Sequence, residues 1–287
     1  MEKLLTVGMA TYDDYDGLFF TIQALRMYHL SELERNNQVE YVVVDNNPTS
    51  AHGRENKKFV ENWVKGKYIP FTSKKSTSVR NEVFKNATGK YTLCLDCHVL
   101  IDKGGIDALL DYYKKDPETK DLVSGPLLYD DLFKSDVSTH FKPGWRDIMY
   151  GMWDTDKESY NKGLPFEIPM MGLGLFSCRT SHWQGFNELF KSFGAEEGYI
   201  HEKFRRAGGK CVCIPQLKWN HRFNRPAGVP YPNILEDRIW NYFIGWLEIL
   251  KDPQHEFFEE TVKAFSDRIP EPAIRAIFER ARKTLNM

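Results

Sequence analysis

The sequence lacks the features that would place it in several large classes of protein. No apolar run approaches the roughly 20 residues needed to span a bilayer, and residues 1–7 lack the charged and apolar regions of a signal peptide. Neither charge dominates, because 39 basic residues balance 40 acidic ones and give a formal net charge of -1. We therefore expect no membrane span and no global positive field that would attract nucleic acid or an anionic membrane.

Cysteine is scarce and odd in number, with five thiols in 287 residues. Cys94 and Cys97 have the spacing of a redox or zinc motif, but no second pair follows at zinc-ribbon spacing. A chain of this length is also not a small scaffold that disulfides must hold together. We expect reduced, structural thiols and a cytoplasmic protein.

Apolar and amphipathic segments alternate along the chain at the periods of strands and helices. The predicted strands are 4–10, 40–44, 91–95, 122–124 and 211–214. The predicted helices are 18–28, 56–65, 76–86 and 106–113. This alternation predicts an α/β fold, with a mostly parallel, Rossmann-like sheet flanked by helices. Ligands of such sheets bind beyond the carboxyl ends of the strands.

The character of the sequence changes in two places. Residues 130–168 are irregular and rich in aromatic and charged residues, so we expect a loop or insertion over the site. From about Pro232 onward the spacing predicts a helical extension. Its three helices are expected at 234–250, 257–265 and 273–285. We therefore divide the chain into a main domain at 1–232 and a helical extension at 233–287.

A carboxylate and an imidazole end one of the predicted strands. Asp96 and His98 follow the apolar run 91–95 and stand two residues apart, so both side chains can face the same side. This pair suits Mn²⁺ or a similar divalent ion with open positions, although an Asp at a strand end is often only a turn residue. His221, just after the strand 211–214, is a candidate third ligand. The three residues together predict a metal site that stabilises a diphosphate leaving group.

Two adjacent carboxylates, Glu196 and Glu197, precede another predicted helix. One interpretation is that these carboxylates simply interact favourably with the dipole at the first turn of the helix and have no further role. They can equally recognise an acceptor or a sugar, or act as a general base. The aromatic residues leave a similar choice between core packing and stacking on sugars, and we assign Trp145 and Trp153 no specific role.

The order of these segments resembles that of GT-A glycosyltransferases of the family-2 type, and most of all the catalytic domain of polypeptide N-acetylgalactosaminyltransferases. The strand ending at Asp45, the helix carrying Arg80 and the Asp96-x-His98 motif follow one another as they do there. Most of the wider superfamily carries Asp-x-Asp, and Asp-x-His is similar to the galactosaminyltransferase form. Further similar segments are 169–177, 193–197, 221–223 and the prolines around Tyr231. The resemblance covers residues 3–232.

The resemblance implies a nucleotide-sugar site with a UDP-sugar donor and Mn²⁺ or another divalent cation. Asp45 would bind the base, and Thr11 would line the same pocket. Asp96, His98 and His221 would bind the metal. The other implied donor contacts are Arg80, Gly172 and Gly174, together with Arg222, Arg225 and Tyr231, which would clamp phosphates from a loop that closes over the donor.

The roles of Glu196 and Glu197 depend on whether the reaction retains or inverts the configuration of the anomeric carbon. In the retaining galactosaminyltransferase type, the leaving phosphate takes the proton of the acceptor hydroxyl and the Glu orients the acceptor. In inverting family-2 enzymes an acidic residue here is the base, and Glu197 would be that base. Asp-x-His and the glycine-rich segment 169–177 favour retention. Phe193 and Ala195 replace a Trp and a Gly, and Glu197 an Asn, so the sugar and the acceptor do not follow from the resemblance.

Two other functions stay open at this point. An inactive module that only binds a nucleotide sugar or a glycan would share the fold, but retained metal ligands and Glu196 argue against it. A nucleotidyltransferase would need a glycine-rich, basic loop after the first strand, where residues 11–16 are acidic. We predict a hexosyl- or N-acetylhexosaminyl-transferase whose acceptor is a glycan, a lipid-linked intermediate, a protein or a modified nucleic acid. The C-terminal helices could bind acceptor, form a homodimer or support the fold.

Overall fold

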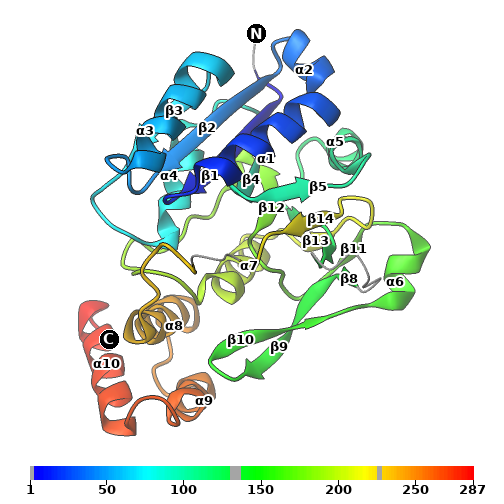
Figure 1. The fold of residues 1–287 in the computed structure, drawn as a ribbon. Coiled ribbons are helices and arrows are strands. Elements are labelled where there is room, and N and C mark those ends of the chain that lie inside the picture. Colours follow the sequence, from blue (N-terminus) through cyan, green and yellow to red (C-terminus); the bar gives the residue numbers. More distant parts are fainter. Residues whose placement is uncertain (1–2, 130–136, 225–227) are drawn as a thin grey trace.

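The computed structural model describes residues 3–129, 137–224 and 228–287. Its largest element is an eight-stranded sheet with helices packed around it, and the C-terminal helices lie below this sheet in Figure 1. The order across the sheet is β11 (Phe166–Glu167), β13 (Cys211–Cys213), β6 (Leu122–Ser124), β12 (Leu175–Arg179), β4 (Tyr91–Asp96), β1 (Leu5–Thr11), β2 (Val39–Asp45) and β3 (Lys67–Pro70). The predicted α/β fold with a mostly parallel sheet is confirmed.

The parallel pairing of β1 with β2 and β4 brings the ends of three strands together. Thr11 pairs with Asp45 across β1 and β2, and Ala10 pairs with Asp96 across β1 and β4. The interiors of these strands are apolar and almost fully buried, as expected for a sheet covered on both faces. Polar side chains therefore become available only where the strands end, and those ends lie side by side. β12 pairs antiparallel with β4 on the other side.

Helices follow most of the parallel strands, and two of them differ from the predicted bounds. The helices of the first half are α1 (Tyr15–Tyr28), α2 (Ser31–Arg35), α3 (Ala51–Lys58), α4 (Arg80–Asn86) and α5 (Gly105–Lys115). The predicted helix 56–65 instead begins at Ala51, because Ser50 caps its polar first turn by accepting a hydrogen bond from the Gly53 N–H. It continues as a π-helix at Phe59–Val64. The predicted helix 76–86 starts with a 3-10 turn, Thr77–Val79.

The prediction that residues 130–168 are irregular is wrong for the described residues 137–168. They contain β8 (Val137–Ser138), β9 (His140–Arg146), β10 (Met149–Asp154), α6 (Lys157–Lys162) and β11. β9 and β10 form an antiparallel hairpin with Asp147 in a left-handed turn, φ 52°. Trp145 and Tyr150 pack on rings of a helix far along the chain, at residues 242 and 246, whereas Phe141 and Trp153 pack on each other. The aromatic residues therefore do not follow the simple alternation by which a strand is recognised in a sequence. A small sheet of β5 (Val99–Ile101), β14 (Trp219–His221), β7 (Leu127–Leu128) and β8 lies beside the main one.

The second half of the chain ends in helices close to the predicted ones. They are α7 (Glu196–Arg206), α8 (Leu235–Leu250), α9 (Glu256–Phe265) and α10 (Glu271–Thr284), and η3 (Thr180–His182) is a short 3-10 turn. α8 packs against α7 and α10, and ten of its residues are buried. The helical extension therefore shares its core with the last helix of the main domain, while the division at residue 232 stays a prediction.

The structure bears on two expectations from composition, the state of the cysteines and the presence of a membrane-spanning helix. All five cysteines are buried thiols, in keeping with a structural role. Among the helices of the described residues, none has the length and hydropathy needed to cross a membrane.

Gly8 allows a close contact between β1 and α4, and this contact can be tested. A Cβ at position 8 would lie 2.1 Å from Cγ1 of Val83. We expect Gly8→Ala to destabilise the protein by about 2 kcal/mol, because the buried strand and helix cannot both keep their places. Val83→Ala removes the obstructing methyl groups, so the double variant should lose clearly less than the sum of the two single losses in urea unfolding. Additive losses would contradict this account of the contact.

Candidate active site

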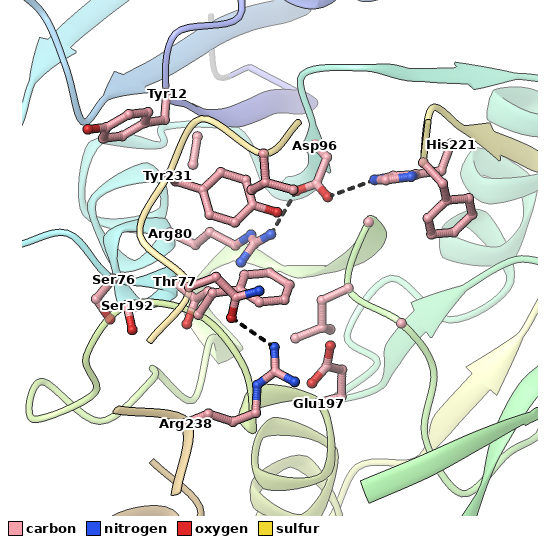
Figure 2. A pocket seen from close by; sticks show the side chains of 18 of the residues that line it. Tyr12, Ser76, Thr77, Arg80, Asp96, Ser192, Glu197, His221, Tyr231 and Arg238 are labelled. Carbon is pink, nitrogen blue, oxygen red and sulfur yellow. Dashed lines mark hydrogen bonds and ion pairs between the residues drawn. The ribbon is translucent and has the colours of Figure 1, made fainter. Parts of the chain in front are cut away.

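A cavity of about 690 Å³ opens at the carboxyl ends of β1 and β4. Its walls come from these strand ends, the Ser76–Arg80 segment, the segment before β12, the starts of α7 and α8, and β14. Figure 2 shows the side chains of Arg80, Asp96, His221 and Tyr231 close together within it. The position agrees with the rule that ligands of open α/β sheets bind beyond the carboxyl ends of the strands.

Asp96, His98 and His221 converge at one side of this cavity. The Nε2 atoms of His98 and His221 lie 3.1 Å apart, and Nε2 of His221 lies 3.4 Å from Oδ2 of Asp96. One ligand atom from each of the three residues falls within 4.8 Å of the others. Ligands at right angles on an ion with bonds of ~2.1 Å would lie about 3.0 Å apart. The spacing and the mixed nitrogen and oxygen donors therefore fit a divalent cation.

The orientation of His98 is set by Asp14, which the sequence did not single out. Nδ1 of His98 lies 2.8 Å from Oδ2 of Asp14, so Nε2 is turned toward His221. Arg222 donates to both oxygens of Asp14 at 2.8 and 2.7 Å, and the Gly17 N–H donates to it at the start of α1. Burial opposes the ionisation of Asp14, but its hydrogen bonds to His98 and Arg222 outweigh burial and hold its pKa well below the ordinary value. A carboxylate behind a histidine ligand fixes its tautomer and its direction.

The buried Arg80 forms an ion pair with the partly exposed Asp96. Its Nη2 donates to Oδ1 of Asp96 at 2.7 Å, and its Nη1 lies 3.9 Å from Oε1 of Glu196. Burial opposes the ionisation of Asp96, but the charge of Arg80 and the hydrogen bond with His221 hold the pKa of Asp96 well below its usual range. Asp96 is therefore an anion that faces the cavity with its second oxygen.

Glu196 and Glu197 begin α7 but occupy different positions. Glu197 lines the cavity, whereas Glu196 is only 1% exposed and its Oε2 has no hydrogen-bond partner among the described residues. Burial, and then repulsion from Glu197, raises the pKa of Glu196, and burial raises the pKa of Glu197. The turn before them places Gly194 and Ala195 at positive φ, 109° and 78°.

Similarity to known proteins identifies the family of this chain. The sequence model described as glycosyl transferase family 2 matches residues 6–177, which is more than half of the 287 residues. The chain belongs to glycosyl transferase family 2. No curated protein sequence matches it significantly. The predicted membership of a family-2 glycosyltransferase superfamily is confirmed.

Solved structures similar to this family-2 transferase share its fold. The crystal structure of GalNAc-T7 with UDP, GalNAc and Mn²⁺ aligns at a TM-score of 0.70 and 15% identity, over 99% of this chain and 55% of that chain. TarS 1-349 of S. aureus in complex with UDP-GlcNAc aligns at a TM-score of 0.56 and 13% identity, over 92% and 73%. The mannosyltransferase PcManGT from Pyrobaculum calidifontis, with GDP-Man and Mn²⁺, aligns at 0.55 and 14%, over 99% and 75%.

These likenesses confirm the GT-A fold predicted for the family-2 transferase. The chain spans about half of the length of the GalNAc-T7 chain that it matches, 55%. At 13–15% identity the three structures show the fold alone. The roles of individual residues in this family-2 transferase are therefore argued from the geometry of its own cavity and not from the three similar structures.

The two residues predicted to bind the base, Thr11 and Asp45, pair with each other across β1 and β2 but differ in their access to the cavity. Thr11 lines the cavity, and its buried Oγ1 has no hydrogen-bond partner among the described residues. Asp45 is fully buried behind the wall, where its carboxylate accepts hydrogen bonds from the Asn47 N–H at 2.8 Å, Tyr68 at 2.9 Å and Asn56 at 3.2 Å. Its neighbour Asn46 lines the cavity instead. The role of Asp45 in binding the base stays a prediction.

The glycine-rich segment lies where the resemblance implies. Gly172 and Gly174 both line the cavity of the family-2 transferase. A Cβ at Gly174 would lie 2.7 Å from the Trp219 ring and 3.3 Å from the His221 ring, so only glycine fits without moving a candidate ligand. Tyr231 also lines the cavity, whereas the guanidinium of Arg222 forms an ion pair with Asp14. Arg225 lies outside the described residues.

Several cavity residues of this family-2 transferase had no recognisable signal in the sequence. Asp14 reads as one member of an acidic run and as the N-cap of α1, and only its contact with His98 reveals more. Trp153 lines the cavity beside Gly172, although its place in the sequence indicates no specific role. Arg238 comes from α8, in the predicted extension, where neither a motif nor the resemblance marked it.

Proposed function

We propose that this glycosyltransferase transfers a sugar from a UDP-sugar to a hydroxyl acceptor, with a divalent cation and with retention at the anomeric carbon. The convergence of Asp96, His98 and His221 on one side of the cavity carries the proposal. Their ligand atoms have the spacing of a metal site, and they line the same cavity as Thr11 and Glu197. In this proposal the nucleotide would lie toward Thr11, the diphosphate at the three ligands and the sugar toward Glu197.

Asp96, His98 and His221 would hold Mn²⁺ in this proposal. The ion would supply positive charge to the diphosphate, which stabilises it as a leaving group. Asp14 keeps the Nε2 atom of His98 directed at the site. Arg80 compensates one carboxylate oxygen of Asp96 and leaves the other facing His221. GalNAc-T7 and PcManGT, which share the fold, were solved with Mn²⁺, and this supports the choice of ion.

Glu197 would act on the acceptor side of the site. In the retaining reaction the acceptor oxygen bonds to the anomeric carbon on the face that the diphosphate leaves, and the departing phosphate takes the hydroxyl proton. Glu197 then needs only to orient the acceptor, and Glu196 supports it from the buried side. An inverting reaction with Glu197 as the base is the second candidate, because Glu197 faces the cavity with a carboxylate whose pKa is raised by burial.

Removal of metal ions is the direct test of this function. We expect the purified protein to release UDP from at least one UDP-sugar in the presence of Mn²⁺, and EDTA to abolish that release because the diphosphate then lacks its counter-charge. The measurement is UDP formation over a panel of UDP-sugars, with the anomeric configuration of a transferred sugar read by NMR. Donor binding that needs no metal and leads to no turnover would instead identify an inactive binding module.

The helical extension at 233–287 also belongs to this proposal. We keep 1–232 as the catalytic domain, and we assign the start of the extension to the acceptor end of the cavity because α8 contributes Arg238 to its wall.

A further inference from the structure

Arg238 is a buried cation that makes no direct ion pair with a described carboxylate, although Glu196 and Glu197 lie near enough for its charge to oppose the rise in their pKa. It is 7% exposed, and its Nη2 donates to Oδ1 of Asn233 at 3.1 Å. Its Nε is buried and has no hydrogen-bond partner among the described residues. No carboxylate oxygen of residues 3–129, 137–224 and 228–287 lies within 4.0 Å of its nitrogens. An unpaired buried charge is costly, so a site of this kind favours an anion that arrives with a ligand.

The surrounding backbone makes room for this guanidinium at the cavity wall. A Cβ at Gly194 would lie 2.5 Å from Nε of Arg238, and Gly194 adopts φ 109°, where other side chains are strained. Phe193 lies under the group, with its ring centroid 5.9 Å from Cζ of Arg238. The guanidinium is therefore held in one place beside the cavity instead of turning out to solvent.

Arg238 stands at the end of the cavity that is away from the metal ligands. Figure 2 shows it next to Glu197, with Tyr12 at the opposite end and His221 at one side. The negative charge of a donor diphosphate would lie with the metal ligands, so it would not neutralise Arg238. The group that meets Arg238 belongs to the sugar and acceptor side.

A second unpaired cation comes from the β9–β10 hairpin. Arg146 lines the same cavity and makes no ion pair with any described residue. The hairpin packs against α8 one turn beyond Arg238, because the Tyr150 N–H donates to the Tyr242 hydroxyl at 2.9 Å and the Trp145 and Tyr242 rings lie 5.0 Å apart. Two arginines on elements that pack against each other thus line the cavity.

We propose that Arg238, assisted by Arg146, forms a subsite for an anionic group of the acceptor, a carboxylate or a phosphate monoester on a sugar. Guanidinium groups pair with both of these oxyanions through two parallel hydrogen bonds. Glu197 lies beside the subsite, so the anionic group would be anchored while a neutral hydroxyl of the same acceptor reaches the anomeric carbon. This inference rests on the proposed function, since it assumes that the cavity binds a donor first.

The test compares charged and neutral sugars on the full chain. With UDP and Mn²⁺ present, the affinities of glucuronate, glucose 6-phosphate and glucose are measured by saturation-transfer NMR titration. We expect the two anions to bind roughly 10- to 100-fold more tightly than glucose, which is the effect of a charge-assisted hydrogen bond in a buried site. Arg238→Gln should remove most of this preference. The exposed Arg146→Gln, which has little cause to unfold, should reduce it up to about fivefold.

Controls separate this proposal from the function on which it rests. Arg275→Gln, on α10 and paired with Glu259 and Glu271, should keep the preference in full. Failure of the wild type to bind UDP with Mn²⁺ would overturn the proposed function. Normal UDP binding with equal or undetectable affinity for the anionic sugars would overturn the subsite alone. A preference for UDP-glucuronate over UDP-glucose as donor, without a preference among the free sugars, would assign Arg238 to the donor and also overturn the proposal.

Discussion

Asp96→Asn is expected to lower metal-dependent release of UDP by about a thousandfold, because it removes the one carboxylate among the three candidate ligands. Asp96 stands between Arg80 and His221, with one oxygen 2.7 Å from Nη2 of Arg80 and the other 3.4 Å from Nε2 of His221. An amide keeps the shape but carries no charge. The affinity for Mn²⁺, measured by electron paramagnetic resonance in the presence of UDP, should fall together with turnover.

The same substitution has a structural cost that needs its own control. Without the Asp96 charge the buried Arg80 loses the closer of its two carboxylate neighbours and keeps only Glu196 at 3.9 Å, which we expect to cost about 3 kcal/mol of stability. His221→Asn removes a candidate ligand without touching Arg80, so it should lose Mn²⁺ affinity at a smaller cost in stability. Asp121→Asn removes a carboxylate that binds Tyr112 and the Lys210 N–H far from the cavity, and it should keep full turnover. Wild-type Mn²⁺ affinity in folded Asp96→Asn would disprove the assignment of the site.

Acid is expected to destabilise the protein through His201, a buried residue of α7. Its Nδ1 lies 2.6 Å from the Glu197 carbonyl oxygen, to which it donates, and its Nε2 accepts the Met171 N–H at 3.1 Å. A proton on Nε2 would face that N–H, so the ring is held neutral. Burial is the main cause that lowers the pKa of His201 from 6.5 to about 3, and the bond to Glu197 opposes it only in part.

The sign of the pH dependence follows from this lowered pKa. Between pH 6.5 and about 3 the unfolded chain holds a proton on His201 that the folded protein does not. The contribution of His201 to stability is therefore complete above pH 6.5 and declines as the pH falls, by up to about 1.4 kcal/mol per pH unit and about 4–5 kcal/mol in all. Below the folded pKa no further loss arises from this group.

Urea unfolding of the wild type and His201→Gln, between pH 7.5 and 4.5, isolates this effect. Glutamine offers an amide N–H and a carbonyl oxygen but does not titrate, so other acidic groups affect both proteins alike. We expect the variant to start less stable and to lose less as the pH falls, so that the two curves converge. Parallel curves would show that His201 carries no such shift. The result also bears on the site, since His201 joins the Met171–Gly172 segment to the carbonyl of Glu197.

The spacing of apolar residues within short windows was sufficient to predict most helices and the central parallel strands. Buried strands and amphipathic helices have periods of two and 3.6 residues, which can be recognised in short windows, and the C-terminal helices began and ended near their predicted bounds. His221 was also predicted as a partner of Asp96 and His98, although it follows His98 by 123 residues. That prediction came from the order of motifs shared with a family, because no local pattern links residues so far apart.

By itself, then, the sequence determined the alternating α/β framework, the membership of a glycosyltransferase family and the candidate metal ligands. Only the tertiary structure decided which polar residues meet around them. It turned the carboxylate of Asp45 into the protein interior, placed Asp14 behind His98, and brought Arg238 from the C-terminal helices to the cavity. The physical reason is that side-chain direction and partnership depend on packing between elements distant in the chain, and the nearest residues in the sequence carry no record of it.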